Sequence, residues 1–385
     1  MSYAKAQFKT TKSASPRGRV NLTEFIMEIG KIDTRLANAS VKVTDAVWRS
    51  ALESPFSVHG VTYDSDLGMF LRMPKEVSVK VSPQVRGLSE RTSGGRVRFK
   101  TDSPYVAIHC TAPAFAPMPH MSLTGSHGFS VYADGVFAGK VTPSVDEAMV
   151  KERERITFSG IVRLKGGDVH EIEIYMPLYG GVCELSVGLK EGAALESPRE
   201  YKYKKPIVIY GSSITQGACA SRPGNDFAMH LSRMLDADVI NLGFSGNGNA
   251  EPEMLKYLAS LDASAYVFDY NYYSGRPDRI LPEHYDIYRI LRESDQKVPI
   301  LMIDKPSVIF AGKDYRVRSE IIRATYERAG AEGDRLVAMM DAKELFGEVD
   351  ADACVVDTDH PNDLGFYRMA QSMYPYLKGL LELGE

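Results

Sequence analysis

The sequence has little of what marks secreted, metal-binding or membrane proteins. Its 385 residues include four cysteines and no Cys-x-x-Cys pair, so we expect neither a disulfide framework nor a zinc site. No apolar run approaches the length of a membrane span, and the basic segment from Met1 to Val20 lacks the apolar core of a secretory signal. These absences predict a cytoplasmic protein without a membrane partner.

The charge is also unremarkable, which excludes another class of partner. The net charge is -4, and acidic and basic residues are mixed along the chain, so electrostatics give no reason to expect a nucleic-acid partner. The hydrophobic content of 44% suffices for buried cores, and the length predicts about two domains. The expected ligand is small or neutral.

The first 40 residues are interpreted as an extension that carries one amphipathic helix. Apolar residues recur at helical spacing between Asn21 and Leu36, and Asn21 is a suitable N-cap. Such a helix packs on its own chain or binds a partner, a second copy included, and the sequence leaves both alternatives open. A homo-oligomer is therefore possible.

Residues 41–195 have the pattern of a β-sandwich domain. Short alternating runs are separated by turn residues, as in sheets with one buried face. The expected strands are Val77 to Val81, Val97 to Phe99, Val106 to His109, Phe129 to Tyr132, Ile156 to Leu164 and Ile172 to Tyr175. Pro198 and Pro206 then mark residues 196–205 as a linker.

From residue 206 to residue 385, buried strands alternate with helices, which predicts a parallel sheet in a three-layer α/β/α arrangement. The expected strands are Ile207 to Tyr210, Val239 to Leu242, Ala265 to Phe268, Pro299 to Ile303 and Leu336 to Met340. The expected helices are Phe227 to Leu235, Glu253 to Leu261, Tyr285 to Leu291, Val317 to Ala329 and Leu364 to Leu380. Ligands of such sheets bind beyond the carboxyl ends of the strands.

A candidate nucleophile follows the first of these strands. Small residues precede Ser213, so its hydroxyl is expected where a strand turns into a helix and backbone N–H groups can face an anion. A serine needs an imidazole to take its proton and a carboxylate to hold that imidazole. His360 and Asp357, three residues apart near the C-terminus, can fill these roles.

These residues resemble the conserved blocks of the SGNH hydrolases, also called GDSL-type esterases. Gly211 to Thr215 resembles the first block, Asn241 to Gly248 the second, and Asp357 to Pro361 the last. The resemblance implies a flavodoxin-like catalytic domain that follows a β-sandwich (jelly-roll-like) domain. It also implies that Ser213, His360 and Asp357 are catalytic, and that the oxyanion is bound by the Ser213 N–H, Gly246 and Asn271.

Two blocks depart from the family pattern. The third block usually reads Gly-x-Asn-Asp, whereas this chain has Phe268-Asp269-Tyr270-Asn271 after the strand. In the first block, Ser212 stands where the family usually carries aspartate, so a hydrogen bond that ties down the turn is expected to be replaced. Neither departure removes a reacting group. Taken singly, the glycines could be turn residues, Asp357 a cap and His360 a surface imidazole; their joint occurrence at strand ends favours the esterase interpretation.

The pairing of a β-sandwich with such a domain resembles carbohydrate esterases, which implies hydrolysis of small acyl esters of a carbohydrate, acetyl esters above all, without a cofactor or metal. Candidate substrate-binding residues are Tyr272, Tyr273, Asp304 and Lys305 at the pocket edge, and His120 in a proline-rich loop, a kind of loop that can overhang a neighbouring site. Two alternatives remain: an acyltransferase that uses an alcohol acceptor, and an inactive carbohydrate-binding protein. The expected partner is a small-molecule or oligosaccharide ester.

Overall fold

The structure is a computed structural model that describes residues 44–144, 155–165, 167–270, 284–306, 310 and 313–384, with only the backbone at 313–316. All of these residues belong to one compact unit, Ala39–Glu385. The amphipathic helix predicted between Asn21 and Leu36 lies outside the described residues. Within them, no helix is both long and apolar enough to cross a membrane.

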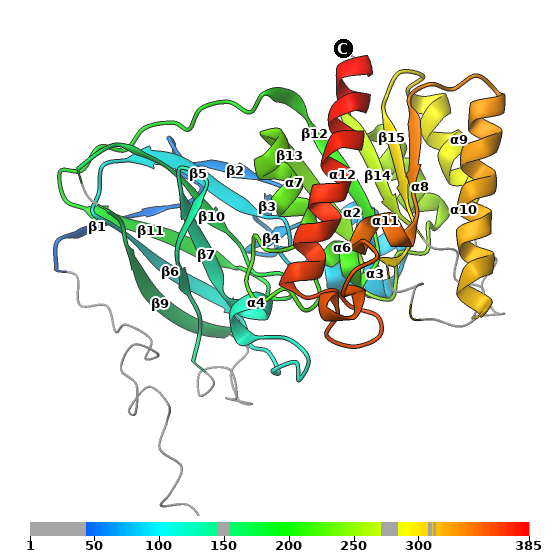
Figure 1. Cartoon of the computed structure of the whole chain (residues 1–385). Coiled ribbons are helices and arrows are strands. Elements are labelled where there is room, and N and C mark those ends of the chain that lie inside the picture. The colour runs from blue at the N-terminus through cyan, green and yellow to red at the C-terminus, as the bar shows by residue number, and fades with distance from the viewer. Residues whose placement is uncertain are drawn as a thin grey trace, which may run out of the picture. The chain divides into compact units, whose positions relative to one another are not determined.

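The second half of the chain forms the predicted parallel sheet (Figure 1). Its strands are β12 (Tyr203–Gly211), β13 (Ala237–Gly243), β14 (Ala265–Asp269), β15 (Ile300–Ile303) and β16 (Val337–Met340). They are ordered β13-β12-β14-β15-β16, and each neighbouring pair is parallel. This is the 2-1-3-4-5 order of flavodoxin-like folds, so the expected fold class is confirmed.

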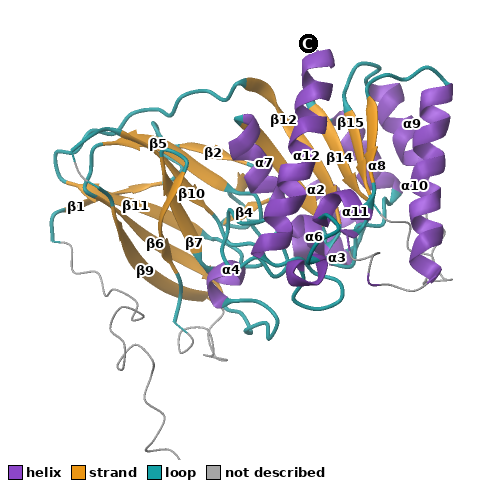
Figure 2. Cartoon of the chain, viewed as in Figure 1, coloured by secondary structure: helices purple, strands orange, loops and turns teal. Residues whose placement is uncertain are grey.

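Helices cover both faces of this sheet because its strands are apolar on both sides. Ile207 and Ile209 of β12 face one core with α6 (Ser213–Gln216), α7 (Phe227–Leu235), α11 (Ala342–Phe346) and α12 (Asp363–Gly384). Val208 and Tyr210 face the other core with α8 (Pro252–Ser260), α9 (His284–Ser294) and α10 (Lys313–Ala331). Figure 2 shows the strands of the sheet enclosed by these helices.

The first half of the chain forms two antiparallel sheets. One has the order β1 (Ala46–Ser50), β11 (Glu184–Lys190), β6 (Tyr105–Pro113), β9 (Arg155–Arg163). The other has the order β2 (Ser57–His59), β5 (Arg96–Thr101), β10 (His170–Tyr175), β7 (Phe129–Ala133), β8 (Val136–Val141). Both contribute side chains to one hydrophobic cluster, as in a sandwich of two sheets. A short hairpin of β3 (Thr62–Asp64) and β4 (Met69–Leu71) lies outside them.

One predicted strand is wrong. The run Val77 to Val81 lies in helix α2 (Lys75–Val81), which is followed by α3 (Pro83–Ser89). The alternating valines suggested a strand, but Val77 and Val81, four residues apart, pack in the same core as α8, whereas Val79 is 52% exposed. The helical spacing of Val77 and Val81 was not recognised because Val79 between them makes the run alternate as a strand does.

Candidate active site

The turn that carries Ser213 is built from small residues at the carboxyl end of β12. Ser212 caps the four-residue helix α6, since its hydroxyl oxygen accepts a hydrogen bond from the N–H of Ile214 at 3.1 Å. Gly211 is required by crowding, because a Cβ there would lie 2.5 Å from Thr215 Oγ1 and 2.6 Å from Asp269 Cβ. The turn thus holds Ser213 half-buried at the edge of the sheet.

The other two predicted reacting groups come from the loop between η4 (Ala351–Cys354) and α12. The N–H of Val356 donates to the His360 carbonyl at 2.9 Å, and the N–H of Asn362 donates to the Cys354 carbonyl at 2.8 Å. The side chain of Asn362 also donates to the Ala353 carbonyl at 2.7 Å. These bonds close the loop on itself and fix the position of its imidazole.

The structure brings Ser213, His360 and Asp357 together. Ser213 Oγ lies 2.9 Å from His360 Nε2, and His360 Nδ1 lies 3.0 Å from Asp357 Oδ2. Burial would raise the pKa of Asp357, but hydrogen bonds from the His360 ring and from the N–H groups of His360 and Asp359 lower it to about 2.

The protonation state of Asp357 fixes the direction of each bond. An ionised carboxylate only accepts, so Nδ1 of His360 is the donor to Asp357. In the neutral ring Nε2 must then accept, and the Ser213 hydroxyl donates to it. This tautomer is the one that lets an imidazole remove a serine proton.

Asp269, at the end of β14, supplies the carboxylate that the turn lacks because Ser212 stands where the family usually carries aspartate. Its Oδ2 atom accepts hydrogen bonds from the Ser212 N–H at 3.2 Å, the Ser212 hydroxyl at 2.6 Å and the Thr215 hydroxyl at 2.9 Å. The carboxylate is buried, and burial raises its pKa against the lowering effect of these bonds. A carboxylate from the neighbouring strand therefore ties down the nucleophile turn. Sequence reasoning missed Asp269, although its position at a strand end was a signal.

The segment after β13, which includes the predicted oxyanion residue Gly246, packs directly on the Ser213 turn. The N–H of Phe244 donates to the Gly211 carbonyl at 2.9 Å, and the N–H of Ser245 donates to Gln216 Oε1 at 3.0 Å. A Cβ on Gly248 would lie 2.4 Å from the Gly211 carbonyl oxygen, so only glycine permits this approach.

Gly246 itself is required for a different reason. Its φ is +65°, a left-handed conformation that strains other residues, while the space beside its Cα is open. The N–H groups of Ser213 and Gly246 donate to no other group in the described part of the chain. They remain available for an oxyanion. The third predicted donor, Asn271, lies outside the described residues.

Arg72 fixes the start of the second block, Asn241 to Gly248, through hydrogen bonds to its backbone. Its guanidinium donates to the carbonyls of Asn241 and Gly243 at the end of β13, and to those of Leu88 and Arg91. The side chain is almost fully buried, and burial lowers its pKa to about 9. A cation that follows β4 thus anchors the strand from which the oxyanion segment departs.

The predicted substrate-binding residues have different environments. The ring of exposed His120 lies 6.2 Å from the ring of His360, centroid to centroid, so the proline-rich loop does reach the site. Lys305 forms an ion pair with Asp359, next to His360. Asp304 is 1% exposed and accepts from the Lys305 N–H and the Ser319 hydroxyl, so its carboxylate is engaged inside the protein. Tyr272 and Tyr273 lie outside the described residues.

Metal ligands were not predicted for this chain. Within the residues that the structure describes, no group of three or more His, Cys, Asp or Glu side chains is arranged to hold a metal ion. The chemistry available at the Ser213 site from described groups is proton transfer and nucleophilic attack.

The fold and the geometry of this site define a class: α/β hydrolytic enzymes of flavodoxin-like topology with a serine, a histidine and an aspartate at the carboxyl edge of the sheet. Family comparison agrees. The GDSL-like lipase/acylhydrolase family model matches residues 204–378, and the model for the N-terminus of SGNH-hydrolase-type esterases matches residues 46–195. The chain belongs to the SGNH hydrolase (GDSL-type esterase) family.

Several solved structures are similar over most of the chain. A Bacteroides ovatus protein assigned as a GDSL-like lipase is 26% identical, with a TM-score of 0.73, covering 88% of this chain and 98% of that one. The salicylyl-acyltransferase SsfX3 from a tetracycline biosynthetic pathway is 20% identical, with a TM-score of 0.68 and the same coverages. A family two carbohydrate esterase from Clostridium thermocellum, solved with cellohexaose, is 13% identical, with a TM-score of 0.56, covering 85% and 99%.

The last two similarities, below 25% identity, concern the fold alone. A comparison with curated protein sequences finds no match.

Proposed function

We propose that this protein is a serine esterase that hydrolyses small acyl esters, acetyl esters of carbohydrates above all, through Ser213, His360 and Asp357. One observation carries the proposal: Ser213 Oγ, both ring nitrogens of His360 and Asp357 Oδ2 form a continuous hydrogen-bonded line, with contacts of 2.9 and 3.0 Å. Membership of an ester hydrolase family agrees with this chemistry.

In the proposed first half-reaction, Ser213 Oγ attacks the ester carbonyl carbon while His360 Nε2 takes the hydroxyl proton. The carbonyl oxygen becomes an oxyanion, which the N–H groups of Ser213 and Gly246 and the Asn271 side chain stabilise. His360 then gives its proton to the departing alcohol, and the acyl group remains on Ser213. Asp357, ionised throughout, stabilises the transient imidazolium.

The second half-reaction repeats these steps with water. His360 Nε2 removes a proton from the attacking water, a second oxyanion forms, and Ser213 leaves with the proton that His360 returns. The products are the carboxylic acid and the free enzyme. No step requires a group beyond the substrate, water and this chain.

The carbohydrate part of the proposal has separate support. His120 extends over the site from the first half of the chain, and Lys305 lies at the rim beside Asp359. An imidazole and an ammonium are suited to bind sugar hydroxyls, whereas a lipid chain would need an apolar groove. The fold neighbours include a carbohydrate esterase solved with cellohexaose. We keep Tyr272 and Tyr273 as proposed stacking residues.

The alternative is transfer of the acyl group to an alcohol other than water. The same three residues serve both outcomes, and the fold neighbours include a salicylyl-acyltransferase. Product analysis with a competing alcohol distinguishes them: transfer yields a new ester, whereas hydrolysis yields free acid. Sugar binding without turnover of any ester would instead favour the inactive carbohydrate-binding alternative.

The direct test is acetate release from acetylated oligosaccharides by the wild type and by Ser213→Ala. We expect the substitution to abolish acetate release, because among the described residues no other hydroxyl is hydrogen-bonded to the His360 ring. Ser245→Ala is a matched control: it removes a hydroxyl from the neighbouring segment but keeps the N–H bonded to Gln216. Full activity in Ser213→Ala would refute the assignment.

A further inference from the structure

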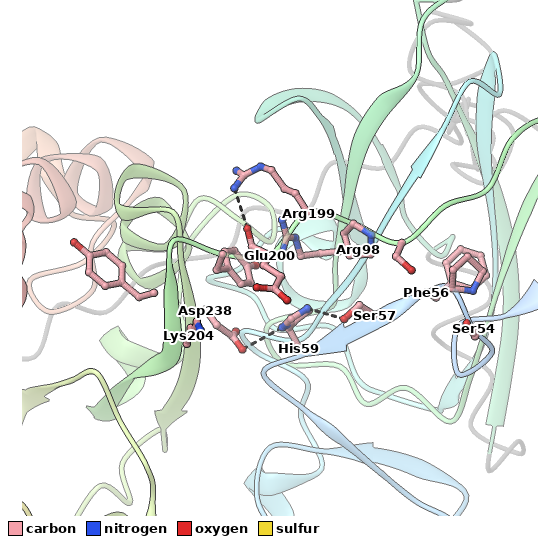
Figure 3. Close-up of a pocket in the computed structure, with 14 residues that line it drawn as sticks. Ser54, Phe56, Ser57, His59, Arg98, Arg199, Glu200, Lys204 and Asp238 are labelled. Carbon is pink, nitrogen blue, oxygen red and sulfur yellow. Dashed lines mark hydrogen bonds and ion pairs between the residues drawn. The ribbon is translucent and has the colours of Figure 1, made fainter. Parts of the chain in front are cut away.

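A pocket lies at the start of β12 and β13, whereas the Ser213 turn follows the end of β12. Residues of β2, β5, β13 and the segment 197–204 line it, and its volume is about 600 Å³, enough for a small organic ligand (Figure 3). The rings of Phe56 and Tyr201 supply apolar surface, while Arg199, Glu200 and Lys204 supply charge.

Three lining residues repeat the arrangement found at Ser213. Ser57 Oγ lies 2.9 Å from His59 Nε2, and His59 Nδ1 lies 3.1 Å from Asp238 Oδ2. Figure 3 shows this line running from β2 to Asp238 across the pocket wall. Ser57 and His59 are two residues apart on one strand, so their side chains lie on the same side of it.

The direction of these bonds is fixed as it is at His360. Burial would raise the pKa of Asp238, but the charge of Arg96 and the hydrogen bond from His59 hold it below the ordinary value, so the carboxylate is ionised at neutral pH. It accepts from His59 Nδ1, Nε2 of the neutral ring accepts in turn, and Ser57 donates its proton. Tyr201 packs edge-on against the ring, with centroids 5.2 Å apart, and holds its orientation.

Two features make this array weaker than the one at Ser213. Asp238 also pairs with buried Arg96, so its charge is partly compensated and stabilises an imidazolium less. Ser57 lies inside a strand paired with β5 and not at a turn between strand and helix. A strand position does not offer the pair of N–H donors that we propose for the oxyanion at Ser213. Loss of such donors costs about a hundredfold or more in rate.

We propose that Ser57, activated by His59 and Asp238, is a second nucleophilic serine that small activated acyl esters acylate within this pocket. Ser57 Oγ bonds to the carbonyl carbon, its proton passes to His59 Nε2, and the C–O bond to the leaving group breaks. The departing alcoholate takes the proton from His59. Because the oxyanion is poorly stabilised, hydrolysis is slow as well, and acyl-Ser57 accumulates as a covalent modification.

The inference does not depend on the role of Ser213, and its test removes that serine. The Ser213→Ala variant is incubated with p-nitrophenyl acetate, and the acetylated residues are identified by peptide mass spectrometry. We expect acetyl-Ser57 to form, and the further change His59→Gln to slow its formation by about a hundredfold, as expected for the loss of a general base. Thermal unfolding of each variant shows whether it is folded.

Ser54 and Ser197 are internal controls, because they line the same pocket and neither bonds to a histidine in the described residues. Should His59→Gln fail to fold, Asp238→Asn, which weakens the array at its far end, takes its place with the same expected direction. Absence of acetyl-Ser57, equal acetylation of Ser54 and Ser197, or a rate indifferent to His59 would each overturn the proposal. Acetylation of Ser57 would uphold it even if Ser213 proved inactive.

Discussion

Among single residues, Asp269 holds the turn that carries Ser213. β12 and β14 are neighbouring strands with Gly211 opposite Asp269, so the carboxylate at the end of β14 reaches the hydroxyls of Ser212 and Thr215. Spacing along the chain does not encode that contact. Ser213, His360 and Asp357 could be proposed from the sequence because acyl transfer needs those side chains and each stands in a block that resembles the family's.

Asp269 leads to a residue-scale prediction. In Asp269→Ala, the Ser212 and Thr215 hydroxyls lose their acceptor, the turn relaxes, and kcat should fall about a hundredfold from misplacement of Ser213. Adding Ser212→Asp to this variant returns a carboxylate to the turn, where related enzymes carry one, and should restore part of kcat. Steady-state kinetics on an acetyl ester measure both effects.

The conservative variant sharpens this test. Asp269→Asn keeps one oxygen that can accept the same bonds, so its loss should be smaller than that of Asp269→Ala. If both single variants keep wild-type kcat, Asp269 does not position Ser213. A fall in KM alone would equally contradict a positioning role.

At the scale of elements, periodicity predicted the parallel sheet well and the first half of the chain less well. The run from Phe227 to Leu235 is helical with the predicted bounds, because it is strongly amphipathic and Asp226 caps it. The strand predicted from Val77 to Val81 was wrong, because valines at every second position fit a strand and also fit a short helix with one exposed and one buried face. The predicted linker at 196–205 covers the gap between the stretches matched by the two family models, but it ends too late, because β12 already begins at Tyr203.

The segment after β13 provides a prediction at this scale. Gly246→Ala has room for its methyl group but must hold a left-handed backbone, so we expect the segment to shift and kcat to fall by about tenfold to a hundredfold, with KM nearly unchanged. Gly347→Ala, also at positive φ with open space but on the loop after α11, is the matched control. Equal kinetics in the two variants would contradict a role for Gly246 in the reaction.

At the scale of the whole molecule, the antiparallel sheets and the parallel sheet share buried polar contacts that composition could not reveal. Arg72 reaches the carbonyls of β13, and Arg96 pairs with Asp238 on the same strand. The Ser93 hydroxyl donates to the carbonyl of Gln216, the last residue of α6, at 2.7 Å. The first half of the chain therefore supports the strands and turns from which the site is built.

This coupling predicts a large loss of stability in Arg72→Met. The substitution leaves the buried carbonyls of Asn241 and Gly243, and the partly buried carbonyls of Leu88 and Arg91, without this donor, which should cost about 3 kcal/mol or more of unfolding free energy. Urea denaturation measures this cost. Arg289→Met removes an exposed ion pair and should leave the urea midpoint nearly unchanged. Equal midpoints for the two variants would contradict the assignment of Arg72.

The central claim is that the aligned hydroxyl, imidazole and carboxylate carry out acyl transfer. The most direct measurement is single-turnover reaction with p-nitrophenyl acetate, stopped by acid and analysed for the acetylated residue. We predict acetyl-Ser213 in the wild type within one turnover, and a rate at least about a thousandfold lower in a folded His360→Ala variant. Turnover by the wild type with Ser213 never acetylated, or with a rate unaffected by His360→Ala, would contradict the account.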